Sequence, residues 1–155
     1  GSIQSPQNAY ILNLGLESLA LRMERHCSNA LKMAEFLQSH KRVDWVIYPG
    51  LKGDKSYELG QKYLPNGSCG VLSFGVKGGR KAAEEFMRHL KVIVIETHVA
   101  DARSCCLHPA SATHRQMNDE ELKNAGVYPE LVRLSVGIEN IDDLIEDVAQ
   151  ALDKV

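Results

Sequence analysis

The sequence has little of what marks several large classes of protein. Its 18 Lys and Arg residues are interspersed with 20 Asp and Glu, for a net charge of −2, so there is no basic stripe for nucleic acid. It has no long apolar run, so no membrane partner is expected. The four cysteines lack CxxC spacing, which favours reduced thiols in the cytoplasm over a disulfide framework. No glycine-rich phosphate loop is present.

What is present is enough apolar sequence for one folded domain. The chain has 155 residues, of which 44% are hydrophobic. Periodicity and turn residues predict five strands, at about 43–48, 69–76, 92–95, 104–108 and 131–138. Helices are predicted at about 54–63, 80–90, 118–125 and 140–152. This order predicts an α+β fold: a small, mostly antiparallel sheet with helices on one face and a strand–strand hairpin at 92–108.

The chain opens on a helical pattern that is long for such a domain. Ser5 and Pro6 form a helix start, and apolar residues recur at three- and four-residue spacing to about Gln38. An unbroken helix of this length would measure roughly 45 Å, whereas the radius of gyration expected for the domain is about 15 Å. The helix therefore either bends near Gly15 or packs its first half on protein outside this sequence. We favour the second explanation.

Arg133 is the most informative charged residue. It lies in the predicted strand 131–138 among apolar neighbours, where a guanidinium is costly unless it meets an anion. Two explanations remain open from the residues alone. One is a structural ion pair with an internal Asp or Glu. The other is a binding site for the carboxylate of a small substrate, which a planar guanidinium binds through two parallel hydrogen bonds.

Other residue types that carry chemistry are grouped in sequence, but their spacing gives weak signals. The group comprises His89, His98, Cys105, Cys106, His108 and His114. Adjacent residues of a strand point to opposite faces, so Cys105 and Cys106 do not share one metal ion easily, and we predict no metal site. The two cysteines are expected to be small core residues. Ser104 lies near Asp101 and His108 but on no GxSxG turn, so a catalytic triad is not expected.

A set of motifs in a fixed order resembles the C-terminal part of the Cys/Met metabolism PLP-dependent enzymes. The resemblance covers essentially the whole chain, and its closest likeness is to the O-acetylhomoserine sulfhydrylases. The motifs include Gly15-Leu-Glu-Ser-Leu19, Leu21-Arg-Met-Glu-Arg-His26, Tyr48-Pro-Gly-Leu51, Gly70-Val-Leu-Ser-Phe74, Val99-Ala-Asp-Ala-Arg-Ser104, His108-Pro-Ala-Ser111, Thr113-His114, Arg133-Leu-Ser-Val-Gly-Ile-Glu139 and Ile141-Asp-Asp-Leu-Ile145.

The resemblance implies roles for three residues. In the family the arginine of the R-L-S-V-G-I-E stretch binds the α-carboxylate of the substrate, and that residue is Arg133 here. A second contact comes from the loop before the fourth strand, at a position where the cystathionine enzymes carry Ser and many sulfhydrylases carry Asn. The matching residue here is His98. The next residue, Val99, would contribute its backbone N–H.

The resemblance also implies a fold and a role for the domain. The family forms its Schiff base on a lysine in a larger upstream domain, and no segment of this chain matches it. We therefore expect residues 1–155 to be the single C-terminal, small domain of a fold type I PLP enzyme, with residues 1–20 as the helix that links it to the PLP domain. The chain alone would hold no catalytic or PLP-binding residue and would be inactive.

The expected function of the complete protein is that of a cytoplasmic, homotetrameric transferase that makes homocysteine from an O-acetylhomoserine-like amino acid. A cystathionine γ-synthase or lyase is the alternative within the family. A free-standing α+β module that binds amino acids through Arg133 is the alternative from another class.

Overall fold

The computed structural model describes residues 1–155 and contains a five-stranded sheet in the order β1-β2-β5-β4-β3. The strands are β1 (Val43–Ile47), β2 (Val71–Val76), β3 (Val94–Ile95), β4 (Cys105–Leu107) and β5 (Leu131–Ser135). All neighbouring strands pair antiparallel except β3 and β4, which are parallel. The predicted α+β fold with a mostly antiparallel sheet of five strands is confirmed.

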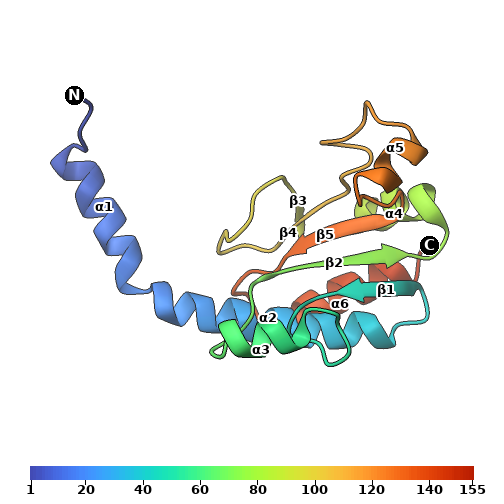
Figure 1. Cartoon of the computed structure of the whole chain (residues 1–155), viewed down its shortest axis with the longest axis horizontal. Helices are drawn as coiled ribbons and strands as arrows, with labels where there is room; N and C mark the ends of the chain where they lie inside the picture. Colours follow the sequence, from blue (N-terminus) through green and yellow to red (C-terminus); the bar gives the residue numbers. More distant parts are fainter.

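The helices are α1 (Pro6–Glu17), α2 (Leu19–Ser39), α3 (Tyr57–Tyr63), α4 (Gly79–Arg88), α5 (Asp119–Asn124) and α6 (Ile141–Leu152). Several begin at predicted capping residues. The Ser5 hydroxyl accepts the N–H of Asn8, and Asn118 forms a capping box with Glu121. Helices α2, α4 and α6 pack on the sheet and on one another, as Figure 1 shows.

The hydrophobic core lies between these three helices and one face of the sheet. On β5, Val132 and Leu134 belong to the core cluster, together with Phe74 of β2 and Met33 of α2. Because strand side chains alternate between faces, Arg133 points to the face opposite this core. The same face carries Cys105 and Leu107 of β4, both of which are buried.

The opening helix is not one straight element. It is interrupted at Ser18, whose φ and ψ are −103° and 4° and whose N–H bonds to the carbonyl of Leu16. The break lies three residues after Gly15, so a bend near the predicted place does occur. No residue of α1 is buried, and Figure 1 shows α1 projecting away from the rest of the molecule.

The predicted hairpin at residues 92–108 is wrong, because β3 and β4 run parallel. The reason is a set of contacts from distant residues. The Asp147 carboxylate of α6 accepts the N–H groups of Lys91, Val92 and Ile93, which fixes the start of β3. The loop 96–104 then crosses back along the sheet before β4 begins, instead of turning tightly.

No helix in this fold is both long enough and apolar enough to cross a membrane.

Candidate functional site

The candidate site is centred on Arg133 at the middle of β5. In the sheet register, Arg133 is flanked by Ser73 of β2 and Leu107 of β4. Its side chain is half-buried, and Nη2 donates to the carbonyl oxygens of Thr97 at 2.7 Å and His98 at 3.3 Å. Nε is shielded from solvent and has no hydrogen-bond partner.

Arg133 has no protein counter-ion. It takes part in none of the ion pairs of the structure. The structural ion pair considered for this residue is therefore wrong. The charge of this half-buried guanidinium is met only by carbonyl dipoles. Such a group can still bind an anion.

The loop 96–104 forms one wall of the site. The Oγ atom of Ser135, on the same face as Arg133, accepts the N–H of Ala100 at 3.1 Å. Ala100 has a φ of 61°, and it is the one residue other than glycine with a positive φ. The His98 ring and the Val99 side chain are 68% and 52% exposed, and the Val99 N–H has no protein acceptor. His98 and Val99 therefore lie in the segment that contacts Arg133.

A buried polar network fixes the end of this loop to the chain after β5. The Glu139 carboxylate accepts the N–H of Ser104 at 2.6 Å and its hydroxyl at 3.0 Å, and the Ser104 hydroxyl accepts the N–H of Gly137 at 2.8 Å. A side chain on Gly137 would collide with Glu139 and with the loop backbone. Sequence reasoning missed this network, although Ser104 and Glu139 each end a motif of the resemblance.

Two buried polar residues of α2 hold the same segment from the helical side. The His26 ring N–H donates to the carbonyl of Val136 at 2.7 Å. The Asn29 amide donates to the carbonyls of Gly137 and Glu139 at 3.0 and 2.9 Å. The signal in the sequence was a polar pair at i and i+3 on the apolar face of a helix.

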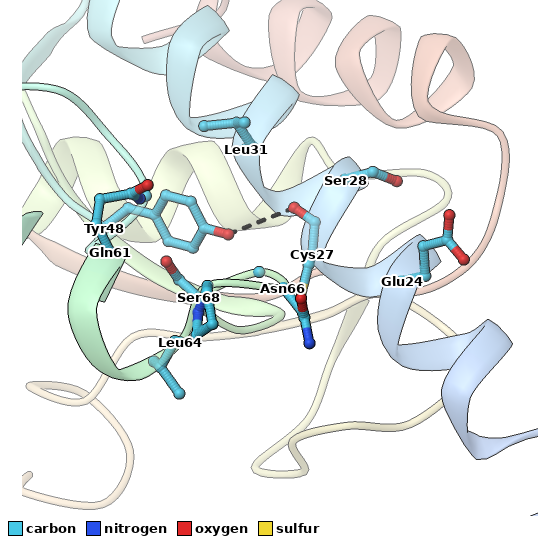
Figure 2. A pocket seen from close by; sticks show the side chains of 12 residues that line it. Glu24, Cys27, Ser28, Leu31, Tyr48, Gln61, Leu64, Asn66 and Ser68 are labelled. Atoms are coloured by element: carbon cyan, nitrogen blue, oxygen red, sulfur yellow. Dashed lines mark hydrogen bonds between the residues drawn. The ribbon is translucent and has the colours of Figure 1, made fainter.

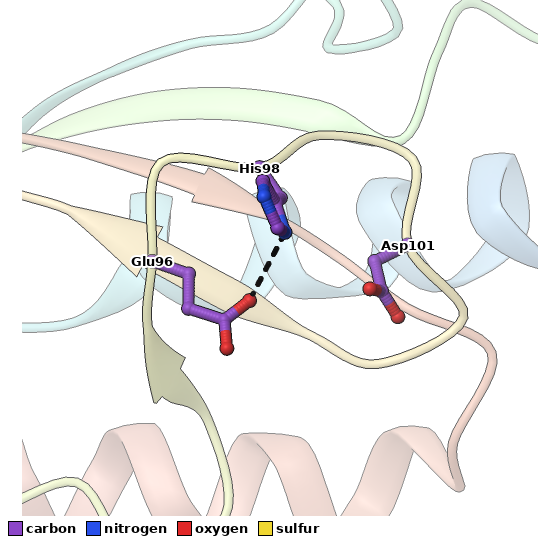
Figure 3. Close-up of side chains that lie close together, drawn as sticks. All are labelled: Glu96, His98 and Asp101. Carbon is purple, nitrogen blue, oxygen red and sulfur yellow. Dashed lines mark ion pairs between the residues drawn. The ribbon is translucent and has the colours of Figure 1, made fainter.

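Figure 3 shows Glu96, His98 and Asp101 grouped beside the site, with ligand atoms within 4.8 Å of one another. His98 pairs with Glu96 at 3.3 Å. The Arg103 guanidinium forms ion pairs with both carboxylates of this group, at 3.5 Å from Asp101 and 3.9 Å from Glu96. Hydrogen bonds from the Arg103 backbone N–H and side chain hold the pKa of Asp101 below its ordinary value. The group is thus a charge network that orders the loop.

The other residue types grouped in the sequence are not brought together for catalysis. His108 is buried, with its ring bonded to Ser111 and to the carbonyl of Pro129 at 2.7 Å each, so it forms no triad with Ser104. Cys105 and Cys106 are both buried, as predicted, and Cys106 belongs to the core. Burial raises the pKa of the Cys106 thiol to about 12, which makes it unreactive at neutral pH.

The molecule also has a hollow of about 290 Å³ between α2, the end of β1 and the segment 61–68 (Figure 2). The hydroxyl of Tyr48 donates there to the carbonyl oxygens of Cys69 at 2.9 Å and Cys27 at 3.4 Å. Burial raises the pKa of the Cys27 thiol. Glu24 is the only charged residue of the lining, so the hollow has no cation for a carboxylate.

No lysine of this chain is placed to hold PLP as a Schiff base. All ten lysines are exposed, whereas a reactive amine needs a desolvated position that lowers its pKa. The residues of this chain thus fit an amino-acid carboxylate and do not by themselves fit the cofactor.

Comparison with known proteins identifies the family. The Cys/Met metabolism PLP-dependent enzyme family matches residues 1–153. The chain belongs to this family. Enzymes of this family depend on PLP, as the resemblance of the motifs implied.

Several relatives are similar along the whole chain. An O-acetyl-L-homoserine sulfhydrylase from Leptospira meyeri is 47% identical and a homocysteine synthase from Schizosaccharomyces pombe 46%, over 100% and 99% of this chain. An L-methionine gamma-lyase from Fusobacterium nucleatum is 39% identical over 100% of it. The alignments cover only 35%, 36% and 39% of the relatives, so the chain spans little more than a third of their length.

The fold is also that of a family member. A crystal structure of a putative O-acetylhomoserine (thiol)-lyase from Campylobacter jejuni, with N′-pyridoxyl-lysine-5′-monophosphate, matches with a TM-score of 0.89 and 41% identity. The match covers 99% of this chain and 36% of the Campylobacter jejuni chain. The α+β fold is therefore that of one part of a larger PLP enzyme.

Proposed function

We propose that this chain is the substrate-binding C-terminal domain of a PLP-dependent O-acetylhomoserine sulfhydrylase, in which Arg133 binds the α-carboxylate of the amino-acid substrate. The observation that carries the proposal is the half-buried guanidinium of Arg133, which has no acidic partner and lies on the face of β5 opposite the hydrophobic core. Residues 1–155 form this domain, and residues 1–20 lead to the PLP-binding part of the same protein.

The geometry of Arg133 suits a planar carboxylate. The carbonyls of Thr97 and His98 hold one side of the guanidinium through Nη2, which fixes the plane of the group. A carboxylate then gains a charge-assisted pair of hydrogen bonds from a fork that is already oriented. The Val99 N–H and the His98 ring add donors beside it. Holding the carboxylate orients the α-hydrogen of the substrate for reaction.

The cofactor belongs to the rest of the protein. PLP supplies the stabilisation of the carbanion when it is bound, and the residues of this chain position the amino acid against it. All lysines of this chain are exposed, which supports the proposal that residues 1–155 are inactive without the PLP-binding domain. The absence of buried residues in α1 supports a role for this helix as the link to the PLP domain.

The sulfhydrylase activity is favoured over the other reactions of the family. Two O-acetyl-L-homoserine sulfhydrylases and the homocysteine synthase are 44–47% identical to this chain, whereas three L-methionine gamma-lyases are 39–42% identical. The proposal therefore assigns the complete protein to the transferases, acting as a cytoplasmic homotetramer. Four unpaired cysteines support the reducing compartment.

The test is turnover by the full-length, PLP-loaded protein. Homocysteine formation is measured with O-acetyl-L-homoserine and sulfide, and compared with cystathionine formation from the same substrate and L-cysteine. Release of methanethiol from L-methionine measures the lyase reaction. The proposal predicts the highest kcat/KM with sulfide. A higher value with L-cysteine or L-methionine would assign the protein to a synthase or a lyase instead.

A further inference from the structure

One residue of the loop that faces Arg133, Ala100, has a backbone conformation that a non-glycine residue does not prefer. Ala100 has a φ of 61°, in the left-handed region where a Cβ atom is crowded by the backbone. Such a conformation persists only when neighbouring groups enforce it. The group that contacts Ala100 is the Oγ atom of Ser135, which accepts the Ala100 N–H at 3.1 Å.

The position of Ser135 ties this bond to the carboxylate site. Ser135 is buried and lies two residues after Arg133, so both side chains point to the same face of β5. Ser135 fixes the loop at Ala100, and Arg133 contacts it at Thr97 and His98. His98 and Val99 thus lie between Thr97, whose carbonyl Arg133 contacts at 2.7 Å, and Ala100, which Ser135 holds.

We propose that Ser135 is a positioning residue for substrate binding: its hydroxyl holds Ala100 left-handed and so sets the distance between Arg133 and the His98–Val99 segment. Ser135 does not touch the substrate. The inference rests on the proposed function, since it specifies what fixes the distance between Arg133 and the His98–Val99 segment in the carboxylate site. It assigns the specificity for a carboxylate to a hydrogen bond outside the site.

Other contacts hold the residues on both sides of Ala100. The Cys105 thiol donates to the His98 carbonyl at 3.1 Å, and the Asp101 carboxylate accepts the Arg103 N–H at 2.9 Å. The Glu139–Ser104–Gly137 network fixes the last residue before β4, and Ile138 N–H bonds to the carbonyl of Ala102. Loss of the Ser135 bond therefore frees Ala100 and the adjoining Val99 N–H, while the residues on both sides stay attached. Its effect is expected on substrate affinity and not on the stability of the fold.

The experiment uses variants of the full-length, PLP-loaded protein. Ser135→Ala is expected to raise the KM for the amino-acid substrate about three- to tenfold, the range for loss of one hydrogen bond, with kcat within about twofold. The dissociation constant of L-alanine, which has the carboxylate but no leaving group, rises in parallel. Ser39→Ala, which removes a hydroxyl on α2 remote from the loop, is the control and leaves both unchanged.

Variants of Ala100 separate positioning from general packing, because Ala100 is exposed and its replacement leaves the core intact. A valine disfavours a positive φ, so Ala100→Val raises KM as Ser135→Ala does. If Ser135→Ala does not fold, the KM of Ala100→Val tests the inference in its place. Glycine adopts a positive φ without strain, so adding Ala100→Gly to Ser135→Ala returns KM to within about twofold of the parent value.

An unchanged KM in Ser135→Ala or Ala100→Val, or no recovery with glycine, would overturn the inference. A loss of kcat/KM in Arg133→Lys alongside such a result would overturn this inference alone. An unchanged kcat/KM in Arg133→Lys would instead remove the proposed function on which it rests.

Discussion

Arg133 owes its character to what surrounds it at the scale of single atoms. Its neighbours on β5 pack into the core, so the strand alternation leaves its side chain on the opposite face of the sheet. Two carbonyl oxygens meet one nitrogen of the guanidinium, and no carboxylate neutralises it. Carbonyl dipoles orient a charge without cancelling it, so the residue retains its affinity for an anion.

The identity of this residue was predictable from the sequence, whereas its surroundings were not. A lone arginine in a strand of apolar residues indicates an anion partner. The sequence left open whether that anion is an internal carboxylate, because this depends on which distant residues the fold brings near β5. The contacts of Ser135 with Ala100 and of Glu139 with Ser104 join segments 35 residues apart, beyond the reach of periodicity.

Buried His108 gives a prediction for pH. Its pKa lies below the ordinary value because burial disfavours the charged ring. The unfolded chain therefore binds a proton more readily than the folded one below about pH 6.5, and the stability that the neutral ring contributes is lost as the pH falls towards the folded pKa. The melting temperature should fall between pH 7.5 and 5.5, and His108→Gln should flatten that slope. An unchanged slope in the variant would contradict this assignment.

At the scale of elements, the sequence predicted the helix starts and strands that depend on interactions between residues close in sequence. The caps at Ser5 and Asn118 and the core strands follow from neighbouring residues. The parallel pairing of β3 and β4 does not, and the start of β3 is held by Asp147 of α6, more than 50 residues away in the sequence. The interruption at Ser18 lies three residues after Gly15, where a bend was the less favoured of the two explanations for the long helical pattern.

Helix α1 exposes several large apolar side chains. Tyr10, Ile11, Leu12, Leu14 and Leu16 are 51–62% exposed. They lie on more than one side of the helix, a pattern that belongs to helices surrounded by protein. An exposed apolar surface of this kind favours association.

Hydrogen exchange tests this element directly. In the isolated chain, amides of α1 should exchange faster than those of residues 23–37, because only the latter pack on the sheet. In the full-length protein the same α1 amides should become protected. Equal protection along both helices in a dilute monomer of the isolated chain would show that α1 needs no partner.

At the scale of the whole molecule, the two faces of the sheet differ in what they carry. One face of the sheet carries α2, α4 and α6 and supplies the stability of the domain. The other carries Arg133 beneath the loop 96–104. We propose that the PLP-binding domain of the complete protein lies on the side of Arg133.

The most direct test of the role of Arg133 measures two properties of one variant, Arg133→Lys, in the full-length protein. Lysine keeps the charge but loses the planar fork, which costs about 1.5–3 kcal/mol in a charge-assisted contact and lowers kcat/KM roughly ten- to a hundredfold. The melting temperature should stay within about 2 °C, because no protein carboxylate loses its partner. A variant that unfolds several degrees earlier but keeps its kcat/KM would contradict the account.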